Sequence, residues 1–88
     1  MAGYITITDH ALEAMQERGA SEAEVRVAAQ NGEMIPAKKG RFIYVKNFSF
    51  DAIWRGKYYK VKQVHAVVSH HGEERRVVTV IVKYFGEE

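Results

Sequence analysis

The sequence contains no cysteine, only one proline and no long apolar run. Without cysteine, disulfide bonds, thiolate zinc sites and cysteine nucleophiles are all excluded. The longest apolar stretch, residues 77–82, is interrupted by Thr79 and falls far short of the roughly 20 residues that span a membrane. Residues 1–4 also lack the basic and apolar regions of a secretory signal. We therefore expect a cytoplasmic protein that does not bind membranes.

Several catalytic motifs are missing as well. The chain has neither a glycine-rich phosphate loop nor the Gly-x-Ser-x-Gly motif of serine hydrolases. A metal site made of His65, His70 and His71 is disfavoured, because no histidine or carboxylate stands at ligand spacing on a helix and the last two histidines fall in a predicted loop. We therefore expect neither a metal nor another cofactor.

Two helices are predicted in the first third of the 88-residue chain. Residues 10–18 are rich in helix formers, follow two N-cap candidates at positions 8 and 9, and stop at Gly19. A capping box at Ser21–Glu24 begins a second helix, which stops at Gly32. The side chains expected to face the core are Ala11, Leu12, Met15, Val25, Ala28 and Ala29.

The rest of the chain has the composition of β-strands. Strands are expected at 41–47, 48–54, 58–69 and 77–85, with a turn at 55–57 and a polar loop at 70–74. Residues 4–7 form either a short strand or an extended lead-in. The sequence therefore predicts a single domain, residues 1–88, of the α+β class, in which two N-terminal helices pack on a four-stranded antiparallel sheet (ααββββ, two layers).

Charged residues are distributed unevenly along the chain. Residues 1–35 hold two cations against six acids, a net charge of −4, whereas residues 36–88 hold eleven cations against five acids, a net charge of +6. Between Lys38 and Lys62, eight cations accompany one acid, and seven of the ten aromatic residues fall in the same stretch. Because cations neutralise phosphates and exposed rings stack on single-stranded bases, this stretch favours RNA as a partner. The RNA-binding candidates are Lys46, Tyr58, Lys60 and Lys62.

The same residues also have an ordinary structural interpretation. In this alternative, the aromatic side chains fill a small core, and the lysines cover the outer face of a sheet whose other face packs on helices. The clustering of positive charge, more than the presence of lysines, favours the RNA-binding interpretation.

Histidine titrates nearest to neutral pH, so each of the four histidines is a candidate for proton transfer. His10 lies in the first turn of the first predicted helix, where the helix dipole favours its neutral, proton-accepting form. His65 lies in the middle of a predicted strand, and His70 and His71 fall in the predicted loop. The structural alternatives are a capping role for His10, an internally hydrogen-bonded sheet histidine for His65, and solvated loop side chains for the other two.

A set of short motifs spread over nearly the whole chain resembles a known family. The motifs are His10-Ala11, Met15, Glu17-Arg18-Gly19, the capped helix from Ser21, and Thr79-Val80. They resemble a prokaryotic family of domains of unknown function whose first helix has the pattern His-Ala-x-x-Arg-Met-x-x-Arg-Gly. That family is grouped with the small RelE- and BrnT-like toxins of the barnase–EndoU–colicin–RelE fold, whose members are mostly metal-independent ribonucleases.

The resemblance implies an RNA-acting, toxin-like domain, with RNA (including ribosome-bound mRNA) and an antitoxin protein as partners. His10 and Arg18 match the two polar residues of the family's first helix, whereas Ala14 stands where an arginine is common. Metal-free RNA cleavage needs a base, an acid and cations around the phosphate. The expected catalytic residues are His10 as base or acid, Arg18 with Lys60 and Lys62 as charge stabilisers, and His65 or Tyr84 as the second proton-transfer group.

Two other classes of function stay open. The first is a non-catalytic module that binds RNA or a protein through the same basic sheet. The second is a homo-oligomer whose aromatic strand edge, at Trp54, Tyr58 and Tyr59, forms the interface.

Overall fold

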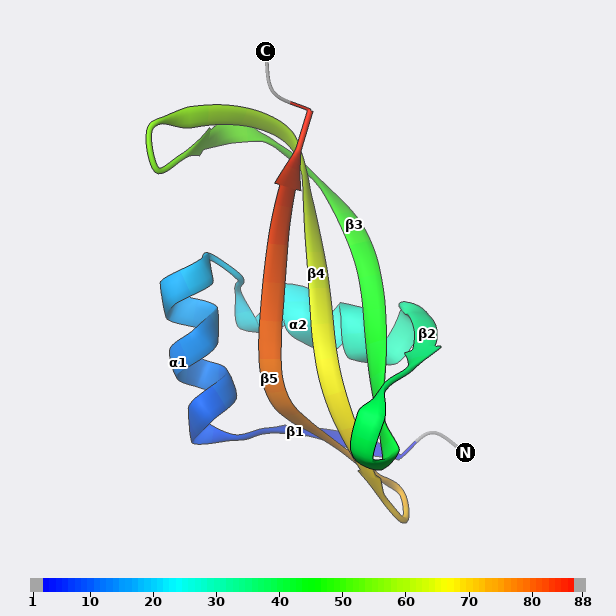
Figure 1. Cartoon of the computed structure of the whole chain (residues 1–88). Helices are drawn as coiled ribbons and strands as arrows, with labels where there is room; N and C mark the ends of the chain where they lie inside the picture. Colours follow the sequence, from blue (N-terminus) through cyan, green and yellow to red (C-terminus); the bar gives the residue numbers. More distant parts are fainter. Residues whose placement is uncertain (1–2, 87–88) are drawn as a thin grey trace.

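The computed structural model describes residues 3–86. The prediction that residues 1–4 are not a secretory signal therefore falls partly, at residues 1–2, outside the described residues. Its elements are β1 (Tyr4–Ile7), α1 (Asp9–Arg18), α2 (Glu22–Asn31), β2 (Glu33–Pro36), the 3₁₀ turn η1 (Lys38–Gly40), β3 (Arg41–Trp54), β4 (Lys57–His71) and β5 (Glu74–Phe85). All five strands belong to one sheet in the order β1-β5-β4-β3-β2 (Figure 1). β1 runs parallel to β5, and the other neighbouring strands are antiparallel. Within residues 3–86, no helix is long and apolar enough to cross a membrane.

The expected four-stranded antiparallel sheet (ααββββ) is wrong, although the molecule is α+β and has the two predicted helices. Residues 41–54 form one strand where two were expected, because nothing near Asn47 turns the chain. A bulge between Ser49 and Ala52 only bends it, with Asp51 at a φ of 51°. β1 and β2 are added at the two edges, which makes the sheet five-stranded and mixed.

The helix boundaries follow the signals in the sequence. The Thr8 side chain caps α1 by accepting a hydrogen bond from the Ala11 amide at 3.1 Å, and Gly19 ends the helix at a φ of 85°. The capping box at Ser21–Glu24 begins α2. Leu12 was expected in the core, and this prediction is wrong, since its side chain is 38% exposed.

Both helices pack on one face of the sheet, here named the helix face. α1 lies against β5, and α2 crosses β3 and β4. Figure 1 views the sheet from the opposite side, here named the open face, with α2 behind the strands. Burial of small and branched side chains between helices and sheet supplies the main stabilising term. The fully buried side chains are Ala11, Val25, Ala28, Ala29, Val64, Ala66, Val68, Val77 and Val80.

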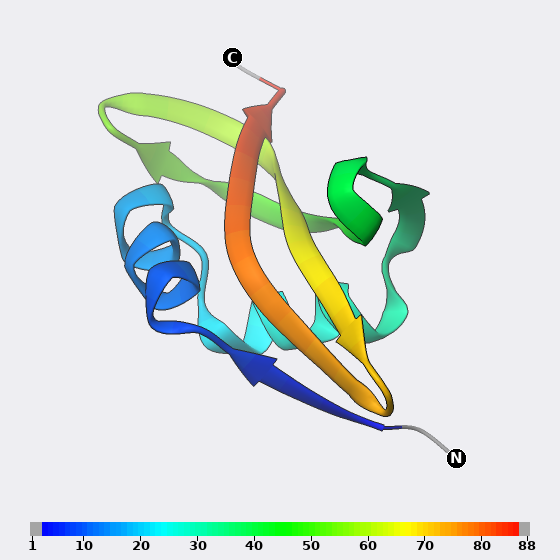
Figure 2. The same cartoon turned by 60° about the horizontal axis from the view of Figure 1, so that its bottom comes forward.

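β3 and β4 continue past the end of β5 as a two-stranded hairpin, residues 50–60, here named the arm. Its turn at Arg55 and Gly56 has a positive φ at both residues (52° and 84°), as a type I′ hairpin requires. The arm bends over the C-terminal end of α1 (Figure 2). There Arg55 Nη2 donates a hydrogen bond to the carbonyl oxygen of Glu17 at 2.7 Å. The arm therefore satisfies a carbonyl group that the helix end leaves without an internal partner.

Aromatic rings fill the space between the arm and α1. The Tyr84 ring of β5 contacts the rings of Phe50, Trp54 and Tyr59, with centroid separations of 5.3, 5.3 and 5.4 Å. Gly19 lies against this stack, and a Cβ at that position would stand 2.5 Å from the Tyr84 hydroxyl oxygen. Three aromatic residues of the predicted RNA-binding stretch are therefore used for packing within the chain.

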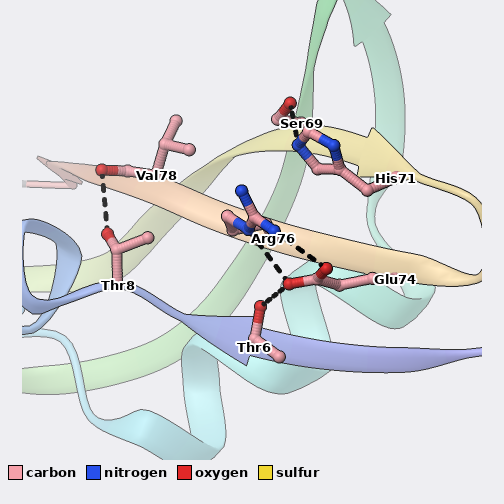
Figure 3. Close-up of polar contacts among 7 residues, drawn as sticks. All are labelled: Thr6, Thr8, Ser69, His71, Glu74, Arg76 and Val78. Carbon is pink, nitrogen blue, oxygen red and sulfur yellow. Dashed lines mark hydrogen bonds and ion pairs between the residues drawn. The ribbon is translucent and has the colours of Figure 1, made fainter.

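At the opposite end of the sheet, polar side chains hold β1 against β5. Glu74 accepts hydrogen bonds from Thr6 Oγ1 at 2.6 Å and from Arg76 Nε and Nη2, each at 3.0 Å (Figure 3). The hydrogen bonds from Arg76 and Thr6 lower the pKa of Glu74 to about 2. The carboxylate is therefore ionised at neutral pH and neutralises Arg76.

Candidate functional site on the helix face

The structure separates the two predicted helix residues, His10 and Arg18. His10 is exposed in the first turn of α1. Arg18 lies about 12 Å further along the helix axis. There its Nη1 donates a hydrogen bond to the carbonyl oxygen of Val80 at 2.6 Å. The two side chains therefore do not share one site.

Lys62 and Tyr84, expected to act on a phosphate and in proton transfer, both hold the turn that follows α1. The buried Lys62 ammonium donates to the carbonyl oxygen of Gly19 at 2.8 Å and pairs with the Glu24 carboxylate at 2.9 Å. The Tyr84 hydroxyl donates to the carbonyl oxygen of Arg18 at 2.8 Å. Burial and then the Glu24 charge raise the pKa of that hydroxyl above its ordinary value. Both polar groups are thus occupied by contacts within the chain.

His65 and the other RNA-binding candidates lie in different parts of the molecule. His65 is on the open face, where its Nε2 lies 2.7 Å from Gln63 Oε1. Lys46 is half-buried on the helix face of β3, whereas Tyr58 and Lys60 belong to the arm. The predicted site residues therefore do not converge on one surface.

A different group of chemically active side chains does come together, on the helix face near the turn between β4 and β5. Tyr44 of β3, His70 of β4 and Arg75 of β5 form this group, here named the cluster. The Tyr44 hydroxyl lies 3.0 Å from His70 Nε2, and the Arg75 guanidinium lies 4.9 Å from the centre of the Tyr44 ring. His70 and Arg75 are direct partners in the β4–β5 pairing, and the Phe42 ring packs against His70 with centroids 4.9 Å apart. Three adjacent strands thus position one tyrosine, one histidine and one arginine.

Arg75 also borders a pocket of about 120 Å³, together with Gly3, Tyr4, Ile5 and Gln30. Its Nη1 donates a hydrogen bond of 2.7 Å to the carbonyl oxygen of Ala29, in the last turn of α2. This bond uses one of the five N–H groups of the guanidinium. Within residues 3–86, no carboxylate pairs with Arg75. A half-buried cation with donors to spare at a pocket is well suited to bind a phosphate or a carboxylate.

Further cations lie beside the cluster. The turn η1 and the residue after it present Lys38, Lys39 and Arg41, all exposed. In the β3–β4 pairing, Arg41 lies opposite Ser69, which immediately precedes His70. Among the described residues, no carboxylate pairs with these three cations. Arg41 shares the open face with Ser69, so Lys38 and Lys39 are the cations that this segment adds near the cluster, and Glu73 lies in the turn beside it.

The cluster escapes prediction from the sequence because His70 is expected in a loop. β4 in fact continues through His71, and the loop shrinks to Gly72–Glu73. Strand alternation then places His70 on the helix face and His71 on the open face, where His71 bonds Ser69 at 2.9 Å (Figure 3). The two-residue alternation of side chains along residues 64–70 could reveal this, if the predicted strand is extended as far as His70.

The cluster can bind an anion and exchange a proton. If His70 donates its Nε2 hydrogen to the Tyr44 oxygen, its Nδ1 keeps a lone pair and can accept a proton. Arg75 supplies fixed positive charge next to that group. In the part of the chain that the structure describes, no three histidine or acidic side chains are grouped as metal ligands.

Comparison with known proteins identifies the family. No curated protein and no solved structure matches the chain significantly. A family model described as "Domain of unknown function (DUF4258)" matches residues 7–82, a segment that begins in β1, ends in β5 and contains the whole cluster. Because this match covers most of the chain, the protein belongs to the DUF4258 family of domains of unknown function.

Proposed function

We propose that this protein binds single-stranded RNA, with a backbone phosphate held at the cluster. The observation that carries the proposal is the half-buried Arg75 guanidinium, which borders a pocket and has no carboxylate partner within residues 3–86. The pocket, about 120 Å³, is smaller than the roughly 300–1,000 Å³ of sites that enclose a small-molecule ligand. It suits a phosphate group whose parent molecule extends over the surface, and the exposed lysines of η1 provide charge along that surface.

Aromatic rings near Arg75 favour a single strand over a duplex. The exposed His70 ring packs against the half-buried Phe42 ring. Exposed rings stack on unpaired bases and contribute about 1–3 kcal/mol per base. Bases in a duplex are already stacked and offer no free face to such rings.

Arg75→Met is expected to weaken binding of a fluorescently labelled single-stranded RNA about tenfold or more, equivalent to about 1.4 kcal/mol. The change removes the guanidinium and keeps an apolar side chain over the Tyr44 ring. Arg76→Met is the matched control, because Arg76 is the next residue, points to the other face and is neutralised by Glu74. We expect less than about a twofold change for this control.

Fluorescence anisotropy at fixed salt measures both affinities, and urea unfolding confirms that both variants fold. Arg75→Lys keeps the charge, so it should retain most of the salt dependence of binding while losing the paired donors of the guanidinium. Unchanged affinity in Arg75→Met, or equal losses in the two methionine variants, would contradict the proposed site.

The His70–Tyr44 hydrogen bond favours a second function, metal-independent RNA cleavage of the kind found in the RelE- and BrnT-like toxins that the sequence resembles. In this reaction the ribose 2′-oxygen forms a bond to phosphorus while the bond from phosphorus to the 5′-oxygen breaks. His70 takes the 2′ proton, solvent protonates the 5′-oxygen, and Arg75 stabilises the negative charge on phosphorus-bound oxygens. The products are a 2′,3′-cyclic phosphate and a free 5′-hydroxyl.

His70→Gln is expected to lower cleavage in EDTA about 100-fold or more, because glutamine cannot accept the proton. RNA affinity should change little, since Arg75 and the exposed lysines remain. His71→Gln, on the open face, is the control and should cleave like the parent protein. A denaturing gel of end-labelled RNA measures the rate; if the parent leaves RNA intact, cleavage is excluded, while the anisotropy experiment still decides on binding.

A further inference from the structure

The pocket beside Arg75 lies on the side of that residue away from the rest of the cluster. Arg75 is the direct partner of Ile5 in the β1–β5 pairing and of His70 in the β4–β5 pairing. Its guanidinium packs on the Tyr44 ring of β3, whereas the pocket is bounded by β1 and by Gln30 in the last turn of α2. Arg75 therefore stands between the cluster and the pocket and can contact a ligand group in each.

Arg75 and Gln30 place hydrogen-bond donors on two sides of the pocket. Arg75 uses Nη1 for the carbonyl oxygen of Ala29 and has further N–H groups to donate. Gln30 contributes a side-chain amide, which can donate two hydrogen bonds. None of the described residues that line the pocket is acidic. These surroundings favour a ligand group that carries negative charge and accepts several hydrogen bonds.

β1 adds a backbone amide on the third side, at the edge of the sheet (Figure 2). The amides of Tyr4 and Thr8 donate hydrogen bonds of 3.1 Å to β5 and to the turn before it. Alternate residues of a strand face the same neighbour, so the amide of Ile5 points to the free edge of β1. The Ile5 carbonyl has the same direction, because it accepts a hydrogen bond from Arg26 Nη1 of α2 at 3.0 Å. The pocket is thus walled on three sides and open to solvent on the remaining one.

We propose that this pocket binds the terminal phosphate of a single-stranded RNA, while the next backbone phosphate lies at the cluster. This binding mode rests on the RNA binding proposed above, and it specifies RNAs that end in a phosphate as the preferred ligands. A backbone phosphate is esterified twice, so the chain must leave it in two directions, which the three walls prevent. A terminal phosphate has one ester bond and can enter from the open side.

A terminal phosphate also matches the donors better than a backbone phosphate does. It offers three free oxygens and a charge of about −1.5 to −2 at pH 7, whereas a backbone phosphate offers two free oxygens and a single charge. The paired N–H groups of a guanidinium suit two such oxygens at once. The bond from Arg75 to Ala29 also sets a positive charge at the end of α2, which offsets the negative end of the helix dipole.

RNAs of one sequence test this preference, each labelled internally and 2′-O-methylated so that it cannot be cleaved. One carries a 5′-phosphate, one a 3′-phosphate, and one has hydroxyl groups at both ends. We expect a phosphorylated RNA to bind about tenfold more tightly than the hydroxyl RNA in fluorescence anisotropy, and the comparison identifies which end enters the pocket. A hydroxyl-ended RNA two nucleotides longer carries about the same charge and should gain less than about twofold.

Gln30→Glu tests whether the preference comes from the pocket. The new carboxylate repels a terminal phosphate, so the ratio of the two dissociation constants should fall from about tenfold to below about twofold. Gln16→Glu is the matched control, because it is the same substitution at an exposed helix position, on α1. This control should keep the preference, and urea unfolding confirms that both variants fold.

The outcomes separate this inference from the proposed function. If the parent binds all of these RNAs equally, terminal-phosphate binding is overturned, while RNA binding at the cluster stands. If the parent binds none of them, both are overturned. A preference that survives in Gln30→Glu also overturns the inference, since the end would then be recognised elsewhere.

Discussion

Replacing Gly19 by alanine is expected to lower the free energy of unfolding by about 3–5 kcal/mol. A φ of 85° lies in the left-handed region, which costs a residue with a Cβ about 1–2 kcal/mol. The added Cβ would also stand 2.5 Å from the Tyr84 hydroxyl oxygen and 2.7 Å from the Trp54 ring. Those side chains would have to move, which breaks the hydrogen bond from Tyr84 to Arg18 and the stacking of Trp54 on Tyr84.

Gly56 offers a matched control for this substitution. Its φ of 84° is nearly the same, and no atom beyond its two neighbours in the chain lies within 4 Å of the position that a Cβ would take. Gly56→Ala should therefore cost only the backbone contribution, about 1–2 kcal/mol. Urea unfolding followed by circular dichroism measures both variants. Equal losses in the two would show that close packing around Gly19 contributes nothing.

Lys62→Met is expected to lower the free energy of unfolding by about 2–4 kcal/mol. Methionine fills much of the same apolar space but leaves the Glu24 carboxylate without its ion pair and the Gly19 carbonyl without its donor. The ammonium also lies 5.0 Å from the centre of the Phe50 ring, and that attraction is lost as well. Lys60→Met, two residues earlier and exposed, is the control and should cost less than about 1 kcal/mol.

A second substitution shows whether the unpaired Glu24 carboxylate causes the loss of unfolding free energy in Lys62→Met. Glu24→Gln in the Lys62→Met protein removes the negative charge, and glutamine still completes the capping box. We expect it to recover about 1–2 kcal/mol, measured by the same urea unfolding. RNA affinity should be the same in the parent and in Lys62→Met. A large loss of affinity in a folded Lys62→Met protein would instead support the phosphate-binding role expected from the sequence.

The helices can be predicted from the sequence because their signals are local. Thr8, Gly19 and the Ser21–Glu24 capping box act on backbone groups within about four residues of themselves. The turn at Arg55–Gly56 is predictable for the same reason, since it depends on two adjacent residues. The exposure of Leu12 is not predictable in this way, because the sheet decides which side of a short helix is covered.

The sheet and the candidate site depend on pairings between distant segments. Tyr44, His70 and Arg75 come from three strands, and no spacing in the sequence marks them as neighbours. Composition does locate the basic stretch, but it cannot distinguish the buried Lys62 from the exposed Lys38. Counting charges measures what a segment contains, whereas a binding site depends on which charges the fold leaves unpaired.

The parallel pairing of β1 with β5 has a consequence for synthesis of the chain. The hydrogen bond from Thr6 to Glu74 joins residues 68 positions apart, so within this domain β1 pairs with the strand that is synthesised last of the five, β5. On the ribosome, α1 and α2 can form early, but β1 has no partner until β5 emerges from the exit tunnel. Closing so long a loop is slow, and an unpaired strand edge invites aggregation meanwhile. In nascent chains that stall before Glu74, β1 therefore stays unpaired and prone to aggregation. We expect chaperones to bind such chains.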